Sequence, residues 1–277
     1  MTRPDFVYSW AVQTLTSQDQ SGDTDEPAPR APSWLLTFLE VPRALSEATG
    51  LLPARSLLRN LPAGDGHAVL TLPGFLASDR SMRIVRSYLQ TWGYRAYPWE
   101  LGRNLGPSRH RDIEHLLDTR LHQVFDENGG KVSLVGWSLG GLLARELARR
   151  NPKLVRSVIT LGSPIGDPRA TNAWRLFEAV SGISVDEAQI RERIRQLRKP
   201  LRGIPMTAIY SRSDAVVSAD IARMPPGRLV ESIGIVASHF GMGFNPAVLF
   251  AIADRLRQHP TDWQPFEISG LRNLFYH

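Results

Sequence analysis

From residue 67 onward, short apolar runs alternate with stretches of helical periodicity, and this alternation limits the fold more than any other feature of the chain. The order is typical of βαβ units, which build a parallel sheet with helices on its faces. The predicted strands span residues 68–72, 94–97, 132–135, 155–161, 206–210 and 229–235, and the predicted helices span 81–92, 111–127, 139–150 and 246–257. We therefore expect an α/β fold with a mostly parallel sheet of about six strands.

The residues upstream of this region have a different character. Residues 1–32 are polar and end in a proline-rich stretch, which predicts a flexible tail. Residues 33–62 are rich in leucine, with Ser33 in position to cap a first helix and Pro42 and Pro53 as interruptions. We expect two or three short amphipathic helices here, which pack against the main domain or serve as a lid or a membrane-surface element.

One insertion breaks the alternation between the fourth and fifth predicted strands. Residues 167–203 carry apolar side chains at helical spacing together with many arginines. This pattern predicts a small, basic helical cap within the main domain, which spans residues 63–277. The charges fit a solvated helix face as well as a rim that attracts anions.

The amino-acid composition excludes several classes of protein and of site. Of the 277 residues, 42% are hydrophobic and 22% are charged, as in a globular protein with a large apolar core. The absence of cysteine excludes disulfides, thiolate metal sites and cysteine nucleophiles. The net charge is +6, but the basic residues are scattered, and we expect no nucleic-acid partner.

Two features of the sequence bear on location. No apolar run approaches the ~20 residues that a bilayer-spanning helix needs. The first residues also lack the pattern of a secretory signal. We expect a cytoplasmic protein, with peripheral membrane contact through residues 33–62 as the alternative.

The strongest chemical signal is the pattern Gly-X-Ser-X-Gly at Gly136, Ser138 and Gly140, between a predicted strand and a predicted helix. At such a turn the serine is lifted out of the sheet, and the two glycines relieve contacts with neighbouring elements. Backbone N–H groups at the start of the helix favour developing negative charge. A plain glycine-rich turn is the alternative, but the strand and helix context favours a nucleophile.

An acid and a histidine follow Ser138 in the order that this architecture requires. Asp214 comes just after the fifth predicted strand, and His239 comes just after the sixth. Carboxyl ends of parallel strands meet at one edge of a sheet, so both side chains should lie near Ser138. Histidine can act as a base near neutral pH, and a carboxylate holds its tautomer. We prefer Asp214 to Asp220 and Asp167 as the acid.

A Pro-Gly turn at residues 73–74 follows the first predicted strand. This turn can aim the backbone N–H of Phe75 at the same oxygen as the N–H of Leu139, which gives the two donors that acyl transfer needs. An ordinary turn is the alternative. The residues predicted to line an apolar substrate pocket beside these positions are Trp137, Phe240 and Met242.

From about residue 67 to residue 259 the chain resembles the α/β-hydrolase superfamily, in its serine lipase and esterase branch. The resemblance rests on residues 73–75, 136–140 and 160–164 together with Asp214, Ser238 and His239. It implies Ser138 as nucleophile, Asp214 as acid, His239 as base, Phe75 and Leu139 as oxyanion donors, and no metal or organic cofactor. The family core usually has eight strands, whereas the region upstream of residue 67 looks helical here.

The expected activity is hydrolysis of a carboxylic ester through an acyl-enzyme on Ser138. The apolar neighbours of the catalytic positions favour a lipophilic substrate, either a small molecule or a lipid-like ester. Three alternatives stay open: an acyltransferase that uses the same acyl-enzyme, a cofactor-free lyase or perhydrolase, and a non-catalytic binding module.

Overall fold

The computed structural model describes residues 31–32, 34–106, 112–181 and 187–277. Six strands form one sheet in the order β2-β1-β3-β4-β5-β6, and all neighbouring pairs are parallel. This confirms the predicted sheet. The strands are β1 (Ala68–Leu72), β2 (Arg95–Pro98), β3 (Val132–Trp137), β4 (Val155–Leu161), β5 (Met206–Tyr210) and β6 (Val230–Gly234).

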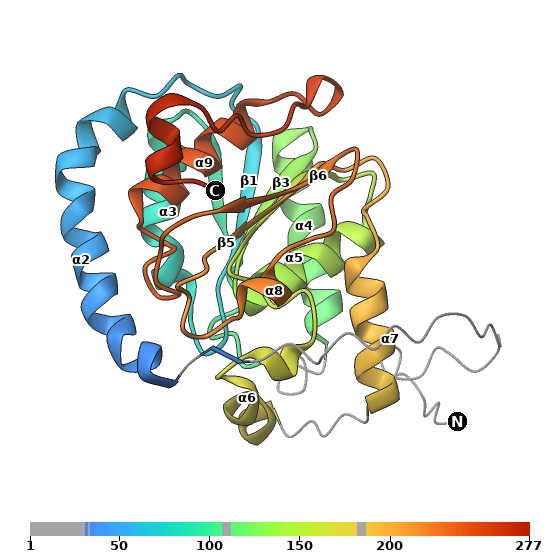
Figure 1. Cartoon of the computed structure of the whole chain (residues 1–277). Helices are drawn as coiled ribbons and strands as arrows, with labels where there is room; N and C mark the ends of the chain where they lie inside the picture. The colour runs from blue at the N-terminus through green and yellow to red at the C-terminus, as the bar shows by residue number, and fades with distance from the viewer. Residues whose placement is uncertain (1–30, 33, 107–111, 182–186) are drawn as a thin grey trace, which may run out of the picture.

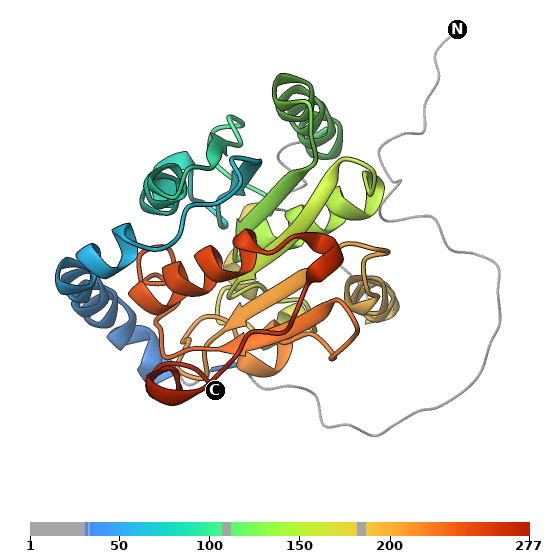
Figure 2. The same cartoon turned by 90° about the horizontal axis from the view of Figure 1, so that it is seen from above.

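Helices cover both faces of the sheet (Figures 1 and 2). On one side are α4 (Ile113–Asn128) and α5 (Leu139–Arg150), and on the other are α3 (Arg83–Thr91) and α9 (Pro246–Arg257). Successive strand residues pack to opposite sides, as Val69 and Leu70 do in β1. Both faces of the central strands are therefore buried, which explains why these strands are mostly apolar. The short helices are η1 (Asp79–Met82), η2 (Pro168–Ala170), α8 (Ala219–Ala222), η3 (Pro260–Asp262) and η4 (Gly270–Leu274).

The strand order fixes where a site can form. The chain passes from β1 to the edge strand β2 and then returns to β3 on the other side of β1. At this switch point the loops that follow β1 and β3 diverge at the carboxyl edge of the sheet, which is where α/β proteins usually bind their ligands. The loops that follow β5 and β6 are neighbours at the same edge, because these two strands are paired.

The insertion between β4 and β5 is helical, as predicted, with α6 (Trp174–Ser181) and α7 (Glu187–Arg198). The end of α7 is attached to α5 by two arginines of α5. Buried Arg145 donates to the carbonyls of Leu197 and Lys199, and Arg149 donates to the carbonyl of Gln196. Cations at a helix C-terminus interact favourably with its free carbonyls. Arginines of the main domain, as well as apolar packing, thus hold α7 in place.

The leucine-rich region forms a single helix, α2 (Trp34–Arg59), and the prediction of two or three short helices was wrong. Pro42 and Pro53 lie inside α2. A proline inside a helix costs about 3 kcal/mol because it removes a hydrogen bond. Both prolines are exposed, and α2 bows outward around the domain (Figure 1). The missing hydrogen bonds are therefore on the convex, solvent side of the helix, where backbone hydrogen bonds are weakest. Packing against α3 and α9 keeps the helix continuous.

The side chains of α2 are distributed unlike those of an ordinary amphipathic helix. Glu40 has no exposed surface, whereas large apolar side chains point to solvent. Those more than half exposed are Phe38, Leu39, Val41, Leu45, Leu52 and Leu57. The helix therefore turns a carboxylate toward the protein and much of its apolar surface away from it. A role as a lid or in membrane contact stays a prediction.

Other predictions for the N-terminal region fall outside the described residues. These are the cap at Ser33 and the flexible tail, apart from Ala31 and Pro32. In the part of the chain that the structure describes, no helix combines the length and the apolar character needed to cross a membrane.

Candidate active site

Ser138 is the single residue between β3 and α5. Its backbone has φ 53° and ψ −122°, a conformation that residues with a side chain rarely adopt. Its N–H donates to the carbonyl of Leu161 on β4 over 2.8 Å, which holds the turn against the sheet. Strain of this kind persists only where the surrounding structure enforces it, and it is common at active sites.

The two flanking glycines are required by close backbone contacts, as predicted. A Cβ atom on Gly136 would lie 2.4 Å from the carbonyl oxygen of Gly140. A Cβ atom on Gly140 would lie 2.3 Å from the carbonyl oxygen of Leu72 on β1. Glycine at position 136 therefore lets the start of α5 fold back onto β3, and glycine at position 140 lets the turn pack against β1.

Asp214 and His239 meet at the carboxyl edge of the sheet. One carboxylate oxygen of Asp214 accepts the N–H groups of Val216 and Val217, each over 2.8 Å. The other lies 2.7 Å from Nδ1 of His239 and accepts its hydrogen bond. Both residues are only 3% exposed. The turn after β5 thus orients the carboxylate, and the carboxylate fixes the imidazole, leaving its Nε2 as the proton acceptor.

The surroundings of His239 determine its pKa. Burial by itself lowers the pKa of the imidazole, but the charge and hydrogen bond of Asp214, together with the charge of Glu40, raise it above its ordinary value. A histidine with a raised pKa is a stronger base once it is deprotonated.

The loop that carries His239 leads into α9, whose start is as predicted. Asn245 caps the helix by accepting the N–H groups of Ala247 and Val248, and Pro246 is its first residue. The indole Nε1 of Trp137 donates to the main-chain carbonyl of His239 over 3.2 Å, which ties this loop to the residue before Ser138.

The structure brings Asp214 and His239 together and places both beside the turn that holds Ser138. Among the described residues, no hydrogen bond joins the Ser138 hydroxyl to the imidazole. Catalytic hydrogen bonds are often long before substrate binds. The two other acids pair with arginines, Asp167 with Arg169 and Asp220 with Arg223.

The loop after β1 packs directly on the turn that holds Ser138. A Cβ atom on Gly74 would lie 3.3 Å from Cβ of Ser138. The backbone N–H groups of Phe75 and Leu139 have no hydrogen-bond partner in the described part of the chain, and Leu139 is the first residue of α5. Two free donors next to Ser138 are what an oxyanion needs.

A buried asparagine that the sequence analysis missed holds this loop. The side-chain amide of Asn104 donates to the carbonyl of Pro73 over 2.8 Å, and its main-chain carbonyl accepts the N–H of Leu76 over 2.7 Å. Asn104 has no exposed surface. A lone asparagine in a loop carries no signal that distinguishes it from an ordinary turn residue.

The predicted pocket residues have different surroundings. Phe240 is 45% exposed, Trp137 is half-buried, and Met242 has no exposed surface. The sulfur of Met242 lies beside Gly162, near the carboxylate of Asp214. Their contact with substrate stays a prediction.

Two aromatic residues of α6 were missed. The ring of Phe177 packs edge-on against Phe75, with centroids 5.3 Å apart, and stacks on Trp174 at 5.6 Å. The cap therefore places aromatic rings over the loop of the predicted oxyanion donors. The spacing of three residues between Trp174 and Phe177 on a helix is the signal that could have identified the pair.

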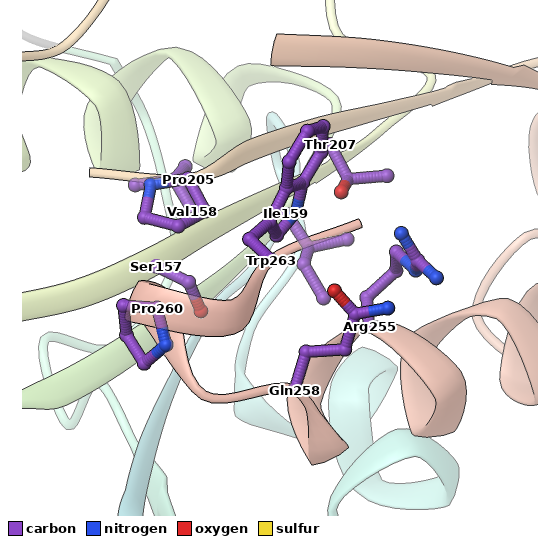
Figure 3. A pocket seen from close by; sticks show the side chains of 9 residues that line it. All are labelled: Ser157, Val158, Ile159, Pro205, Thr207, Arg255, Gln258, Pro260 and Trp263. Carbon is purple, nitrogen blue, oxygen red and sulfur yellow. The ribbon is translucent and has the colours of Figure 1, made fainter. Parts of the chain in front are cut away.

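A small pocket lies at the opposite edge of the sheet, near the start of β4 and β5 (Figure 3). Ser157, Pro205 and Trp263 are among its lining residues, and it has room for about one water molecule. It is separate from the site at Ser138. Within the described ranges, no group of three or more His, Cys, Asp or Glu side chains could hold a metal ion.

The α/β hydrolase fold family model matches residues 69–229, more than half of the chain, so the protein belongs to this family. The match includes Ser138 and Asp214. Six parallel strands, the strained serine turn and the Asp214–His239 pair agree with that assignment.

Part of the chain is similar in sequence to a lipase. A triacylglycerol lipase of Burkholderia plantarii is 31% identical over 144 residues, which cover 50% of this chain and 40% of the relative. The chain therefore matches less than half of that lipase. The chain is a lipase- and esterase-like α/β hydrolase.

Solved structures share the fold. Lipase BlEst2 of Bacillus licheniformis superposes with a TM-score of 0.54 at 16% identity, covering 72% of this chain and 95% of that one. Lipase B of Aspergillus fumigatus superposes with a TM-score of 0.53 at 16% identity, and the match covers 72% of this chain and 55% of that one.

Proposed function

We propose that this protein is a serine-dependent carboxylic ester hydrolase. Ser138 Oγ attacks the carbonyl carbon of the ester while Nε2 of His239 takes its proton. The N–H groups of Phe75 and Leu139 stabilise the oxyanion of the tetrahedral intermediate. Collapse of the intermediate releases the alcohol, which receives the proton from His239. Water, activated by His239, then releases the acid from the acyl-enzyme.

The observation that carries this proposal is the buried Asp214–His239 hydrogen bond of 2.7 Å at the sheet edge where Ser138 sits in a strained turn. A structural ion pair needs neither the strained serine nor two unpaired N–H groups beside it. The three features together match the requirements of acyl transfer.

We further propose a lipophilic acyl group as the preferred substrate. The side chains around the site are aromatic: Phe75 and Phe177 contact each other above the nucleophile turn, and Phe240 is partly exposed next to His239. Apolar walls with few polar groups favour an alkyl chain over a polar acyl group. The relative named as a triacylglycerol lipase is consistent with this preference.

A fluorophosphonate probe tests the mechanism, since it modifies an activated serine covalently. We expect one probe per chain, located on the peptide that contains Ser138, and no labelling of Ser138→Ala. Labelling elsewhere, or none, would contradict the proposed nucleophile. A series of p-nitrophenyl esters then tests the substrate class: rates that peak at acetate would contradict the lipophilic preference. Release of p-nitrophenol that accelerates with an added alcohol, with ester as product, would indicate an acyltransferase instead.

A further inference from the structure

A carboxylate of α2 joins the two loops that hold the acid and the base. One oxygen of Glu40 accepts the N–H of Ala215 over 2.9 Å, and the other accepts the N–H of Phe240 over 3.2 Å. Ala215 directly follows Asp214, and Phe240 directly follows His239. The side chain of Glu40 has no exposed surface. One buried carboxylate thus spans the residues next to both members of the pair.

Neighbouring residues of α2 bind the same loops. Arg43 donates to the carbonyl of Ser213 over 2.5 Å and to its hydroxyl over 2.7 Å. Glu47 accepts the N–H of Ser238 over 2.6 Å and the side-chain amide of Asn245 over 2.8 Å. These contacts lie on the inner side of α2, one and two turns from Glu40, and each connects residues about 170 to 200 positions apart in the chain.

We propose that Glu40 is a positioning residue for the reaction: its carboxylate holds the Asp214 and His239 loops in register and keeps a negative charge beside the base. The inference rests on the proposed function, because it requires His239 to be the base. Glu40 lies outside residues 69–229, which the family model matches. The support for the catalytic pair therefore comes from a helix outside the matched residues.

The charge of Glu40 acts on the pKa of His239 in a definite direction. Asp214, from the loop after β5, and Glu40, from α2, are the charged groups that raise the pKa of His239. Two other charged groups of α2 lie nearby. Nη1 of Arg43 is 3.9 Å from Oε1 of Glu40, and Glu47 accepts the N–H of Ser238, the residue before His239. Removing the negative charge at position 40 destabilises the imidazolium, so the pKa of His239 should fall.

Two variants of Glu40 separate the effect of its charge from the effect of its length. Glu40→Gln keeps the size of the side chain but removes its charge and one acceptor, while Glu40→Asp keeps the charge but shortens the reach. For Glu40→Gln we expect kcat/KM at neutral pH to fall by about 10- to 100-fold, as for a small misplacement of a catalytic group. The acid limb of its pH profile should move to lower pH. For Glu40→Asp we expect a reduced rate with an acid limb close to that of the wild type.

Rates are normalised to the fraction of sites that react with the fluorophosphonate probe, so that unfolded protein does not lower the measured kcat/KM. Leu52→Gln is the matched control, since Leu52 lies on α2 and is 70% exposed. Its rate and pH profile should equal those of the wild type. If Glu40→Gln does not fold, Glu40→Asp decides: a wild-type rate for that variant would overturn the inference.

The inference is also overturned if folded Glu40→Gln has a wild-type rate, or a reduced rate with an unmoved acid limb, which would indicate a structural role alone. The experiment distinguishes failure of the role proposed for Glu40 from failure of the proposed ester hydrolysis. If Ser138→Ala is inactive while Glu40→Gln behaves as the wild type, only the role of Glu40 is lost. If Ser138→Ala is as active as the wild type, the mechanism itself is wrong.

Discussion

Nδ1 of His239 lies 2.7 Å from a carboxylate oxygen of Asp214, and neither side chain is more than 4% exposed. With no water to compete, this hydrogen bond fixes the tautomer that leaves Nε2 free to accept a proton.

Replacing the acid should abolish most of the turnover. Asp214→Asn keeps the shape of the side chain but allows the wrong imidazole tautomer, and we expect kcat to fall roughly 10⁴-fold. The measurement is steady-state hydrolysis of a p-nitrophenyl ester. Asp220→Asn is the matched control, because Asp220 pairs with Arg223 at the surface and should be dispensable. Near-normal rates for Asp214→Asn would assign the acid elsewhere.

The pH dependence of kcat/KM should report the raised pKa of His239. Only the neutral imidazole can take the proton of Ser138, so activity rises as pH increases through this pKa. Because the net effect of burial, Asp214 and Glu40 is an increase, the half-maximal rate should fall above about pH 6.5, the ordinary value. A pH–rate profile on a substrate with no ionisable group checks this, and a midpoint below 6.5 is the contrary result.

The nucleophile turn should tolerate no side chain at Gly140. Because a Cβ atom there would meet backbone of β1, Gly140→Ala should lower the free energy of unfolding by roughly 1–3 kcal/mol. Gly50→Ala is the control. Nothing lies within 4 Å of a Cβ atom at Gly50, which is inside α2, and alanine there should stabilise the protein by up to about 1 kcal/mol. Urea unfolding measures both, and equal effects would refute the packing argument.

The aromatic cap should matter more for long acyl chains than for short ones. Phe177→Ala removes the ring that contacts Phe75, and we expect kcat/KM for a p-nitrophenyl octanoate to fall roughly 10-fold, with a smaller loss for the acetate. Leu176→Ala is the neighbouring control, since Leu176 is 51% exposed. Equal losses on both esters would place Phe177 outside the substrate pocket.

The sheet and the helices against it could be predicted because their signals are local. In β1, β4 and β5 short runs are rich in apolar and β-branched residues, and the predicted bounds match. The start of α9 follows from the capping geometry of Asn245 and Pro246. These patterns need no knowledge of distant residues.

The missed features depend on contacts between distant segments. Pro42 and Pro53 suggested breaks, but the continuity of α2 comes from packing against α3 and α9, which no local pattern contains. Glu40 would be expected at the surface on charge alone, and its burial follows from two N–H donors about 175 and 200 residues away. Asn104 was missed for the same reason.

The central claim is that Ser138 is the nucleophile of an ester hydrolase, and the most direct measurement compares turnover of p-nitrophenyl esters by the wild-type protein and Ser138→Ala at neutral pH. The account predicts that removing the hydroxyl lowers kcat by about 10⁴- to 10⁶-fold while the protein stays folded. Equal rates for the two proteins would contradict it.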